Sequence, residues 1–245
     1  MKLIQLKEVE STHKLALKMI EKDQIGECCI IAERQTGGIG RCGRDWISVE
    51  GNLFASVIKS LPSEALAFGI NNYVARISLA IACAIRQVLT KYIPEHDSNL
   101  CLHWPNDIYY NGLKMSGILL SAVENMMVIS VGVNIRRVSL DSTISLEEIP
   151  GSVSVSAKSL CNSILNEIEA WIHLKNINDF SSIKEYWLDH MVGIGQEASV
   201  RNGMEMQSGI IKGIDDFGRL ILERRQKEIL ISYGDMFVGV RNGEL

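Results

Sequence analysis

The amino-acid sequence predicts an α+β fold made of two unequal domains. Residues 63–92 and 154–174 repeat apolar side chains at helical spacing, and shorter apolar runs elsewhere are typical of strands. Beyond residue 194, short strand-like runs alternate with turn signals, a pattern that favours a small β-barrel. We therefore expect one large domain at residues 1–194 and a small barrel domain at residues 195–245.

The first elements lead into a loop that is rich in glycine and arginine. Residues 3–6 predict a strand, and the hydroxyl residues at 11–12 offer an N-cap to the helix that should follow. Apolar runs at residues 28–32 and 53–58 predict two core strands. The loop at residues 35–46 joins these strands, and loops held on a rigid frame are common places for ligand binding.

The loop at residues 35–46 combines residue types that suit an anionic ligand. It holds four glycines, Arg41, Arg44 and a terminal Trp46. Glycine costs conformational entropy, so four of them suggest a backbone that must come close to a ligand. The arginines can bind a carboxylate or phosphate, and the indole offers a flat face for stacking on a base. The alternative is a mobile surface loop with two solvated arginines.

A second informative stretch covers residues 102–110. A strand runs into a proline turn that presents Asn106 and Asp107, and Asn111-Gly112 then gives a strong hairpin signal. Two antiparallel strands around this turn would bring Asp107 and Lys114 together. The alternative is an exposed turn carboxylate and a solvated lysine.

The remaining elements complete the two domains. Residues 127–133 predict a strand that ends at Asn134, and residues 182–191 predict a short helix. The strands expected in the barrel lie at residues 197–201, 209–214, 219–223 and 228–232.

Composition excludes several classes of protein. The chain is 47% hydrophobic and 22% charged, which is ordinary for a soluble globular protein, and its net charge of −4 argues against bulk nucleic-acid binding. The six cysteines have neither C-x-x-C nor zinc spacing, so we expect reduced thiols in a reducing compartment. No signal peptide or membrane span is expected, and the predicted location is cytoplasmic.

Four stretches together resemble one family. They are EVEST at residues 8–12, the loop at 35–46, WPND at 104–107, and K-x-x-G-I-L at 114–119. Their order and spacing are similar to those of the biotin–protein ligases. The resemblance implies a mixed sheet flanked by helices, as in class II aminoacyl-tRNA synthetases, followed by a small Src-homology-type barrel.

The resemblance also implies an activity. The enzyme would use ATP to convert biotin into biotinyl-5′-AMP and would then transfer biotin to a lysine of a carrier domain in a carboxylase such as acetyl-CoA carboxylase. Magnesium would shield the pyrophosphate, and no metal site made of protein ligands is expected. Lys114 and Arg41 would stabilise charge between the two anions, and Asp107 would orient Lys114 or help deprotonate the acceptor lysine.

The same resemblance implies two overlapping sets of binding residues. Backbone N–H groups of Ile39 and Gly40 would hold the biotin carboxylate, and Trp46 would cover the adenine. The residues expected to bind biotin are Ser11, Thr12, His13, Gln35, Gly38, Ile39, Gly40, Arg41, Lys114 and Gly117. The residues expected to bind ATP are Arg41, Arg44, Trp46, Asn106, Lys114 and Asn134.

Three positions depart from the family pattern. His13 stands where asparagine is usual, Ile39 replaces an arginine, and His103 precedes WPND where lysine is common. Ile39 is compatible with the pattern if that position works through its backbone. His13 changes one expected biotin contact, and His103 is expected to be packed or solvated more readily than catalytic.

Two other functions remain as alternatives. A lipoate or octanoate ligase or transferase shares the fold, although the glycine-arginine loop and the WPND turn argue against it. A nucleic-acid-binding regulator is the second alternative, but only ten residues precede Ser11, so we expect no DNA-binding module. The expected partners are therefore biotin, ATP and a carrier domain, with no DNA and no membrane, and both a monomer and a homodimer fit the pattern.

Overall fold

The computed structural model describes residues 1–22, 26–94, 99–174 and 180–239 of the chain. Across these ranges, seven strands form one mixed sheet, in which β1 and β2 are parallel and every other neighbouring pair is antiparallel. In their order across the sheet, the strands are β1 (Lys2–Val9), β2 (Cys28–Gln35), β3 (Leu53–Ser60), β7 (Met126–Val133), β6 (Leu113–Val123), β5 (Asp107–Tyr110) and β4 (Leu100–His103).

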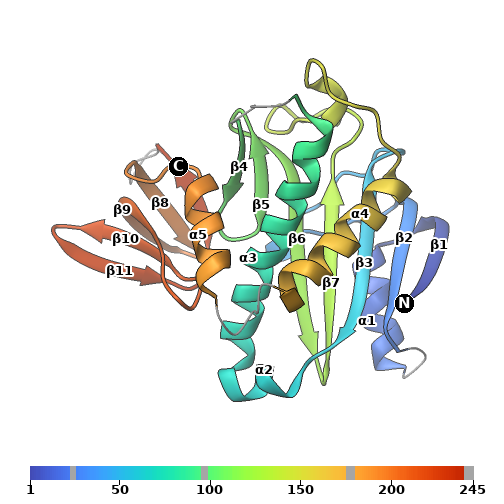
Figure 1. Cartoon of the computed structure of the whole chain (residues 1–245), viewed down its shortest axis with the longest axis horizontal. Coiled ribbons are helices and arrows are strands. Elements are labelled where there is room, and N and C mark those ends of the chain that lie inside the picture. Colours follow the sequence, from blue (N-terminus) through green and yellow to red (C-terminus); the bar gives the residue numbers. More distant parts are fainter. Residues whose placement is uncertain (23–25, 95–98, 175–179, 240–245) are drawn as a thin grey trace.

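Helices cover both faces of this sheet (Figure 1). Helix α3 (Ile70–Leu89) and helix α4 (Ala157–Glu169) pack on one face, where they enclose the main apolar core. Helix α1 (Thr12–Glu21) packs on the other face against β2, β3 and β7. Because side chains alternate along a strand, β2 supplies Cys29 and Ile31 to the first face and Cys28 and Ile30 to the second.

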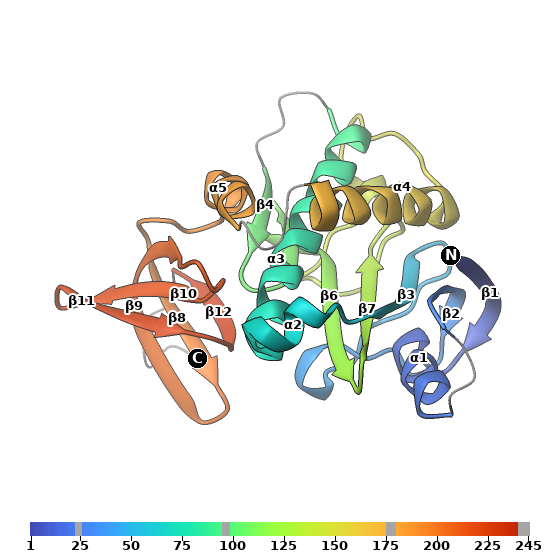
Figure 2. The same cartoon turned by 60° about the horizontal axis from the view of Figure 1, so that its bottom comes forward.

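The C-terminal part is a small antiparallel sheet beside α5 (Ser181–His190) (Figure 2). In the part of the chain that the structure describes, five strands pair in the order β11 (Lys227–Ile231), β10 (Leu220–Arg224), β9 (Glu205–Ile214), β8 (Glu197–Asn202) and β12 (Asp235–Val238). The turn between β9 and β10 contacts the turn between β4 and β5, where the buried Trp104 indole Nε1 donates to the Gly218 carbonyl at 3.0 Å.

The fold class is confirmed, and three elements differ from their predicted form. The helix predicted over residues 63–92 is divided into α2 (Ser63–Phe68) and α3 by Gly69, whose φ of +88° favours glycine. The helix predicted over residues 154–174 begins only after the Ser156 N-cap, and it continues past Glu169 as a π-helical turn. Strand β12 was not predicted, because four residues are too few to give a clear alternating pattern.

Among the residues that the structure describes, one helical segment, Ile70–Tyr92, is long and apolar enough by composition to cross a membrane, but most of it is buried inside the protein. It is the core helix of the fold. None of the six cysteines, all of which lie within the described ranges, forms a disulfide.

Candidate functional site

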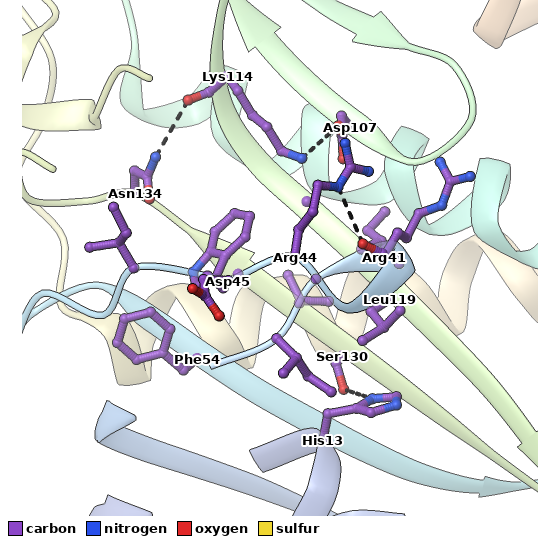
Figure 3. A pocket seen from close by; sticks show the side chains of 18 of the residues that line it. His13, Arg41, Arg44, Asp45, Phe54, Asp107, Lys114, Leu119, Ser130 and Asn134 are labelled. Carbon is purple, nitrogen blue, oxygen red and sulfur yellow. Dashed lines mark hydrogen bonds and ion pairs between the residues drawn. The ribbon is translucent and has the colours of Figure 1, made fainter. Parts of the chain in front are cut away.

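A cavity of about 380 Å³ lies on the α1 face of the large sheet, beneath the loop that joins β2 to β3 (Figure 3). Its floor comes from α1, β2 and β7, and its mouth comes from the loop, β5 and β6. The predicted site residues that line it are Thr12, His13, Gln35, Ile39, Gly40, Arg41, Arg44, Trp46, Asn106, Asp107, Lys114, Gly117 and Asn134. Residues from four separate stretches of sequence therefore meet in one cavity.

The floor of the cavity is formed by polar side chains that hydrogen-bond to one another. The Gln35 side-chain oxygen accepts from the Thr12 backbone N–H at 2.8 Å and from the Thr12 hydroxyl at 3.1 Å. His13 contacts Ser130 through Nδ1 at 2.7 Å. Burial lowers the pKa of His13 from 6.5 to about 4, because a buried imidazolium loses its hydration. The His13 ring is thus neutral at physiological pH.

The loop folds back on itself above this floor. Ile39 and Asp45 form an isolated antiparallel bridge, and the Gly40 N–H donates to the Arg44 carbonyl at 2.7 Å. The expectation that the Gly40 N–H is available for a carboxylate is therefore wrong in this conformation, because the loop uses that donor itself.

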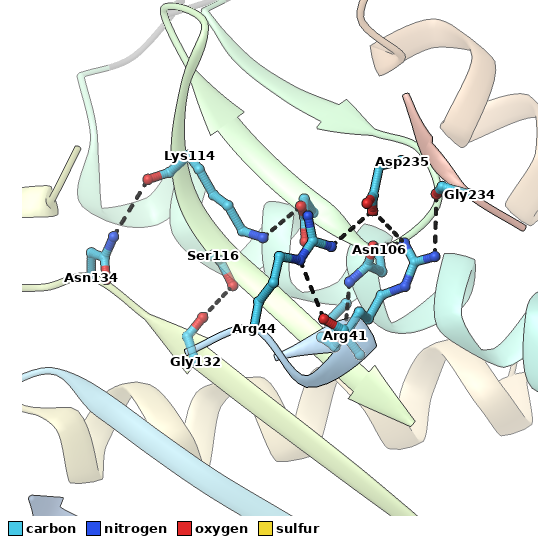
Figure 4. Close-up of polar contacts among 11 residues, drawn as sticks. Arg41, Arg44, Asn106, Lys114, Ser116, Gly132, Asn134, Gly234 and Asp235 are labelled. Atoms are coloured by element: carbon cyan, nitrogen blue, oxygen red, sulfur yellow. Dashed lines mark hydrogen bonds and ion pairs between the residues drawn. The ribbon is translucent and has the colours of Figure 1, made fainter. Parts of the chain in front are cut away.

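Both loop arginines are held by groups outside the loop (Figure 4). Arg41 donates to the Asn106 side-chain oxygen at 2.9 Å and to the Gly234 carbonyl at 3.2 Å. Arg44 donates to the Asp235 carboxylate at 2.8 Å. Gly234 and Asp235 belong to the C-terminal part of the chain, so the small sheet closes the loop over the cavity from outside the large sheet.

The hairpin predicted at Asn111-Gly112 is confirmed, and it brings Lys114 and Asp107 together. The Lys114 ammonium lies 2.6 Å from Asp107 Oδ2, and both side chains are partly buried. The second carboxylate oxygen, Asp107 Oδ1, is buried and has no hydrogen-bond partner. A buried polar atom without a partner is costly, so this oxygen has capacity for a further donor or a cation.

Trp46 lies flat against a pair of glycines in the middle of the sheet. Gly117 and Gly132 face each other across β6 and β7, and a Cβ at Gly132 would stand only 2.5 Å from the indole. The indole Nε1 is buried and lacks a partner, and the Lys114 ammonium lies 5.6 Å from the ring centre. Trp46 therefore forms one wall of the cavity.

Three predicted site residues, Ser11, Gly38 and Asn134, take other or weaker positions, while His103 is packed, as expected. Ser11 does not line the cavity, because it is buried as the N-cap of α1, and its hydroxyl accepts from the Lys14 N–H. Gly38 is also outside the lining, because it packs closely against the Trp46 carbonyl. His103 stacks on Tyr109 at 4.4 Å, and burial lowers the pKa of His103. Asn134 lines the cavity, but its amide makes only long contacts of 3.4 Å.

Several residues at this site were not predicted from the sequence. Ser130 on β7 contributes a hydroxyl to the floor, Ser56 on β3 lies buried behind it and contacts it at 2.7 Å, and Gly132 makes room for the indole. Each serine interrupts an otherwise apolar strand, which is the one sequence signal that could have pointed to it. Asp235 stands 191 residues from Arg44, and no local pattern relates the two.

The arrangement has a clear chemical character. Two guanidinium groups and one ammonium gather at the mouth, while the floor offers neutral hydrogen-bonding groups. Such a cavity suits a molecule with a neutral polar ring at one end and an anionic group at the other. The cationic end can hold two anions close together, which is otherwise prevented by their repulsion.

Comparison with known proteins identifies the family. The model of the biotin/lipoate A/B protein ligase family matches residues 6–135, which is more than half of the chain. The chain belongs to this family. A second model, the biotin protein ligase C-terminal domain, matches residues 193–239, where the small sheet lies. The resemblance deduced from four short stretches is thereby confirmed.

Individual relatives agree with this assignment. The biotin–[acetyl-CoA-carboxylase] ligase of Paracoccus denitrificans is 25% identical, with 96% of this chain and 99% of the relative covered. The bifunctional ligase/repressor BirA of Escherichia coli is 30% identical, with 88% of this chain and 67% of the relative covered. The solved biotin protein ligase of Aquifex aeolicus, in complex with biotin and ATP, superposes with a TM-score of 0.81 over 97% of this chain and 98% of that one, at 24% identity. This last likeness concerns the fold.

Removal of the ion pair between Asp235 and Arg44 should make the loop at residues 35–46 more accessible to protease. In Asp235→Asn, Arg44 loses its carboxylate partner, and an exposed ion pair of this kind contributes roughly 0.2–1 kcal/mol. We expect trypsin to cleave after Arg41 or Arg44 roughly two- to fivefold faster than in the wild type, as measured by mass spectrometry of timed digests. Glu205→Gln, which alters an exposed carboxylate on β9, serves as the control. Equal cleavage rates in both variants would contradict the closing role of Asp235.

The neutral His13 predicts a pH dependence of stability. Its pKa in the folded protein is about 4, below the 6.5 of the unfolded chain, so the unfolded state takes up a proton first as the pH falls. The stabilisation is present above pH 6.5 and is lost toward pH 4, by roughly 3 kcal/mol. We expect the free energy of unfolding of His13→Asn, from urea titrations at pH 7 and pH 4.5, to fall by less than that of the wild type. Parallel losses would show that His13 does not titrate in this way.

Proposed function

We propose that this chain is an ATP-dependent biotin–protein ligase. A carboxylate oxygen of biotin attacks the α-phosphorus of ATP, the bond to the β-phosphate breaks, and pyrophosphate leaves. The amine of an acceptor lysine then attacks the carbonyl carbon of biotinyl-5′-AMP, and AMP leaves. The acceptor lysine belongs to a biotin carboxyl carrier domain of a biotin-dependent carboxylase, in keeping with the names of the relatives.

The observation that carries this proposal is the meeting of Lys114, Arg41 and Arg44 above the neutral floor of a single cavity. Two anions must come together in the first step, and the repulsion between them has to be offset. Lys114 and Arg41 would stabilise the charge that develops between carboxylate and α-phosphate, and Arg44 would hold the remaining phosphates. These phosphates would replace Asp235 as the partner of the guanidinium.

Asp107 has two roles in this scheme. It holds the Lys114 ammonium at 2.6 Å, which fixes the direction of that side chain before the substrates arrive. Its unpartnered Oδ1 is also placed to accept a hydrogen bond from the acceptor lysine, so that Asp107 assists proton removal in the second step.

The two ends of the cavity would receive different parts of the intermediate. Biotin would lie with its ureido ring on the floor, against Thr12, His13 and Gln35, because hydroxyl, imidazole and amide groups match a neutral ring that both donates and accepts. Adenine would lie at the Trp46 and Asn134 end. Asn106 would act by holding Arg41, since its amide oxygen already accepts from that guanidinium.

Magnesium would accompany the phosphates. Among the described residues there is no cluster of three or more acidic, histidine or cysteine side chains, so the ion would be bound largely by phosphate oxygens. The buried Asp107 Oδ1 is a hard oxygen ligand without a partner, and it fits such a shared ion. The ion would neutralise charge on the leaving pyrophosphate.

The remaining expectations follow from the same assignment. A boundary near residue 194 would divide a catalytic domain from the small sheet, with Asp235 as a contact between them. Six cysteines without a disulfide are consistent with a cytoplasmic enzyme. The net charge of −4 supports a protein that does not use DNA as a ligand.

The activity itself can be tested by weighing a carrier domain. The protein is incubated with a biotin carboxyl carrier domain, magnesium and biotin, with and without ATP, and the carrier is analysed by mass spectrometry. We expect a gain of one biotinyl group only when ATP is present. A parallel reaction with lipoate and a lipoyl domain is the control for the other branch of the family, and a gain there alone would overturn the assignment.

Replacement of Lys114 tests the proposed electrostatic role. Lys114→Ala should lose roughly 2.7–4 kcal/mol of transition-state stabilisation, which is about a hundred- to a thousandfold in the rate of adenylate formation. Pyrophosphate release measures that rate, and thermal unfolding shows whether the fold is intact. Lys227→Ala, an exposed lysine on β11, should match the wild type. A Lys114→Ala rate within tenfold of the wild type would mean that this amine is not part of the chemistry.

A further inference from the structure

Six side chains at and beneath the cavity floor form one continuous chain of hydrogen bonds. They come from two strands and a helix on the α1 face, together with the ends of β2 and β6, and every link is 3.1 Å or shorter. In order, the chain consists of Ser121, His13, Ser130, Ser56, Thr12 and Gln35. Thr12, His13 and Ser56 are buried, whereas Ser121, Ser130 and Gln35 are half-buried.

At the Gln35 end of this series of hydrogen bonds, the geometry determines which group donates and which accepts. The Thr12 backbone N–H can only donate, so the Gln35 atom that it meets at 2.8 Å is the amide oxygen. That oxygen can only accept, and the Thr12 hydroxyl at 3.1 Å therefore donates to it. The Thr12 hydrogen is then in use, so Ser56 is the donor in its 2.8 Å contact with Thr12.

The direction propagates because each hydroxyl has a single hydrogen. Ser56 has donated to Thr12, so Ser130 is the donor in the 2.7 Å contact between the two serines. Ser130 must then accept from His13 Nδ1 at 2.7 Å, which places a proton on that nitrogen. Because burial keeps the pKa of His13 low, the ring is neutral, and Nε2 accepts from Ser121 at 2.9 Å.

We propose that His13 is a positioning residue, held in the Nδ1–H tautomer, that directs the hydroxyl hydrogens of Ser130, Ser56 and Thr12 along the floor toward Gln35. The hydroxyl oxygens that line the cavity, those of Ser130 and Thr12, then have only lone pairs left for a ligand. The floor accepts hydrogen bonds from N–H groups and offers no hydroxyl donor. This inference rests on the proposed function, because it names the N–H groups of the biotin ureido ring as the donors.

The opposite tautomer conflicts with the geometry. If Nε2 carried the proton, Ser130 would have to donate to Nδ1, and no hydrogen would remain between Ser130 and Ser56 at 2.7 Å. Two oxygens only 2.7 Å apart would then face each other with their lone pairs, which is unfavourable in a partly buried site. The donor–acceptor direction is therefore shared by all the hydrogen bonds in the series. His13 is the member that can take either of two neutral tautomers.

The tautomer can be observed without any substrate. Long-range ¹⁵N–¹H correlation spectra of the uniformly ¹⁵N-labelled protein at pH 7 distinguish Nδ1–H, Nε2–H and the imidazolium, and the His13 signals are assigned by their absence in His13→Asn. We expect the Nδ1–H pattern in the ligand-free protein. An Nε2–H or charged ring would overturn the inference, whatever the protein does with biotin.

Binding measurements then separate a directing role from a merely structural one. Asparagine keeps a donor where Nδ1 lies, whereas leucine keeps bulk but no donor. We expect the Kd for biotin, from titration calorimetry, to rise roughly tenfold in His13→Leu and less than threefold in His13→Asn, in line with the loss of one hydrogen bond.

The outcomes distinguish this inference from the proposed function. If the spectrum shows the Nδ1–H ring but the protein binds no biotin, the donor–acceptor direction along the floor stands and the proposed ligand is wrong. Equal weakening of biotin binding in the leucine and asparagine variants would overturn the directing role while leaving the ligase activity in place. If His13→Leu does not fold, the NMR spectrum and the asparagine variant decide the question.

Discussion

The pairing of two glycines across β6 and β7 determines where the loop can lie. Gly117 and Gly132 leave a flat area in the middle of the sheet, and the Trp46 indole packs against it. A Cβ at Gly132 would lie only 2.5 Å from the indole, so any other residue there would displace the ring. With its last residue fixed there, the loop crosses above the cavity and its arginines reach the mouth. The position of the cationic groups thus depends on the absence of two side chains.

The charges around the mouth are balanced within the protein. Lys114 is paired with Asp107, and Arg44 with Asp235, while Arg41 is held by an amide and a carbonyl oxygen. Each cation is thereby oriented before a ligand arrives, and little reorganisation is needed to exchange a carboxylate for a phosphate. The neutral groups of the floor are likewise held in place before a ligand binds, because they hydrogen-bond to one another. His13 adds no charge there at physiological pH.

The sequence predicted the parts of the site that depend on local pattern. The Asn111-Gly112 turn determines how Lys114 approaches Asp107, and the glycine-arginine loop was recognisable from its composition. Residues brought in by strand pairing were missed. Ser56 and Ser130 share a face only because β3 pairs with β7 in one register, and Asp235 reaches Arg44 only after the small sheet has folded. The use of the Gly40 N–H inside the loop was also beyond any local pattern.

The contact between the loop and the end of the chain bears on how such proteins can be recombined. Gly234 and Asp235 supply a carbonyl and a carboxylate to a loop that begins near residue 35. The two parts of the chain are therefore not interchangeable modules, even though each has its own sheet. A chimaera that joined this ligase region to a foreign C-terminal sheet would keep the closed loop only if the new sheet delivered the same two oxygens to the same place.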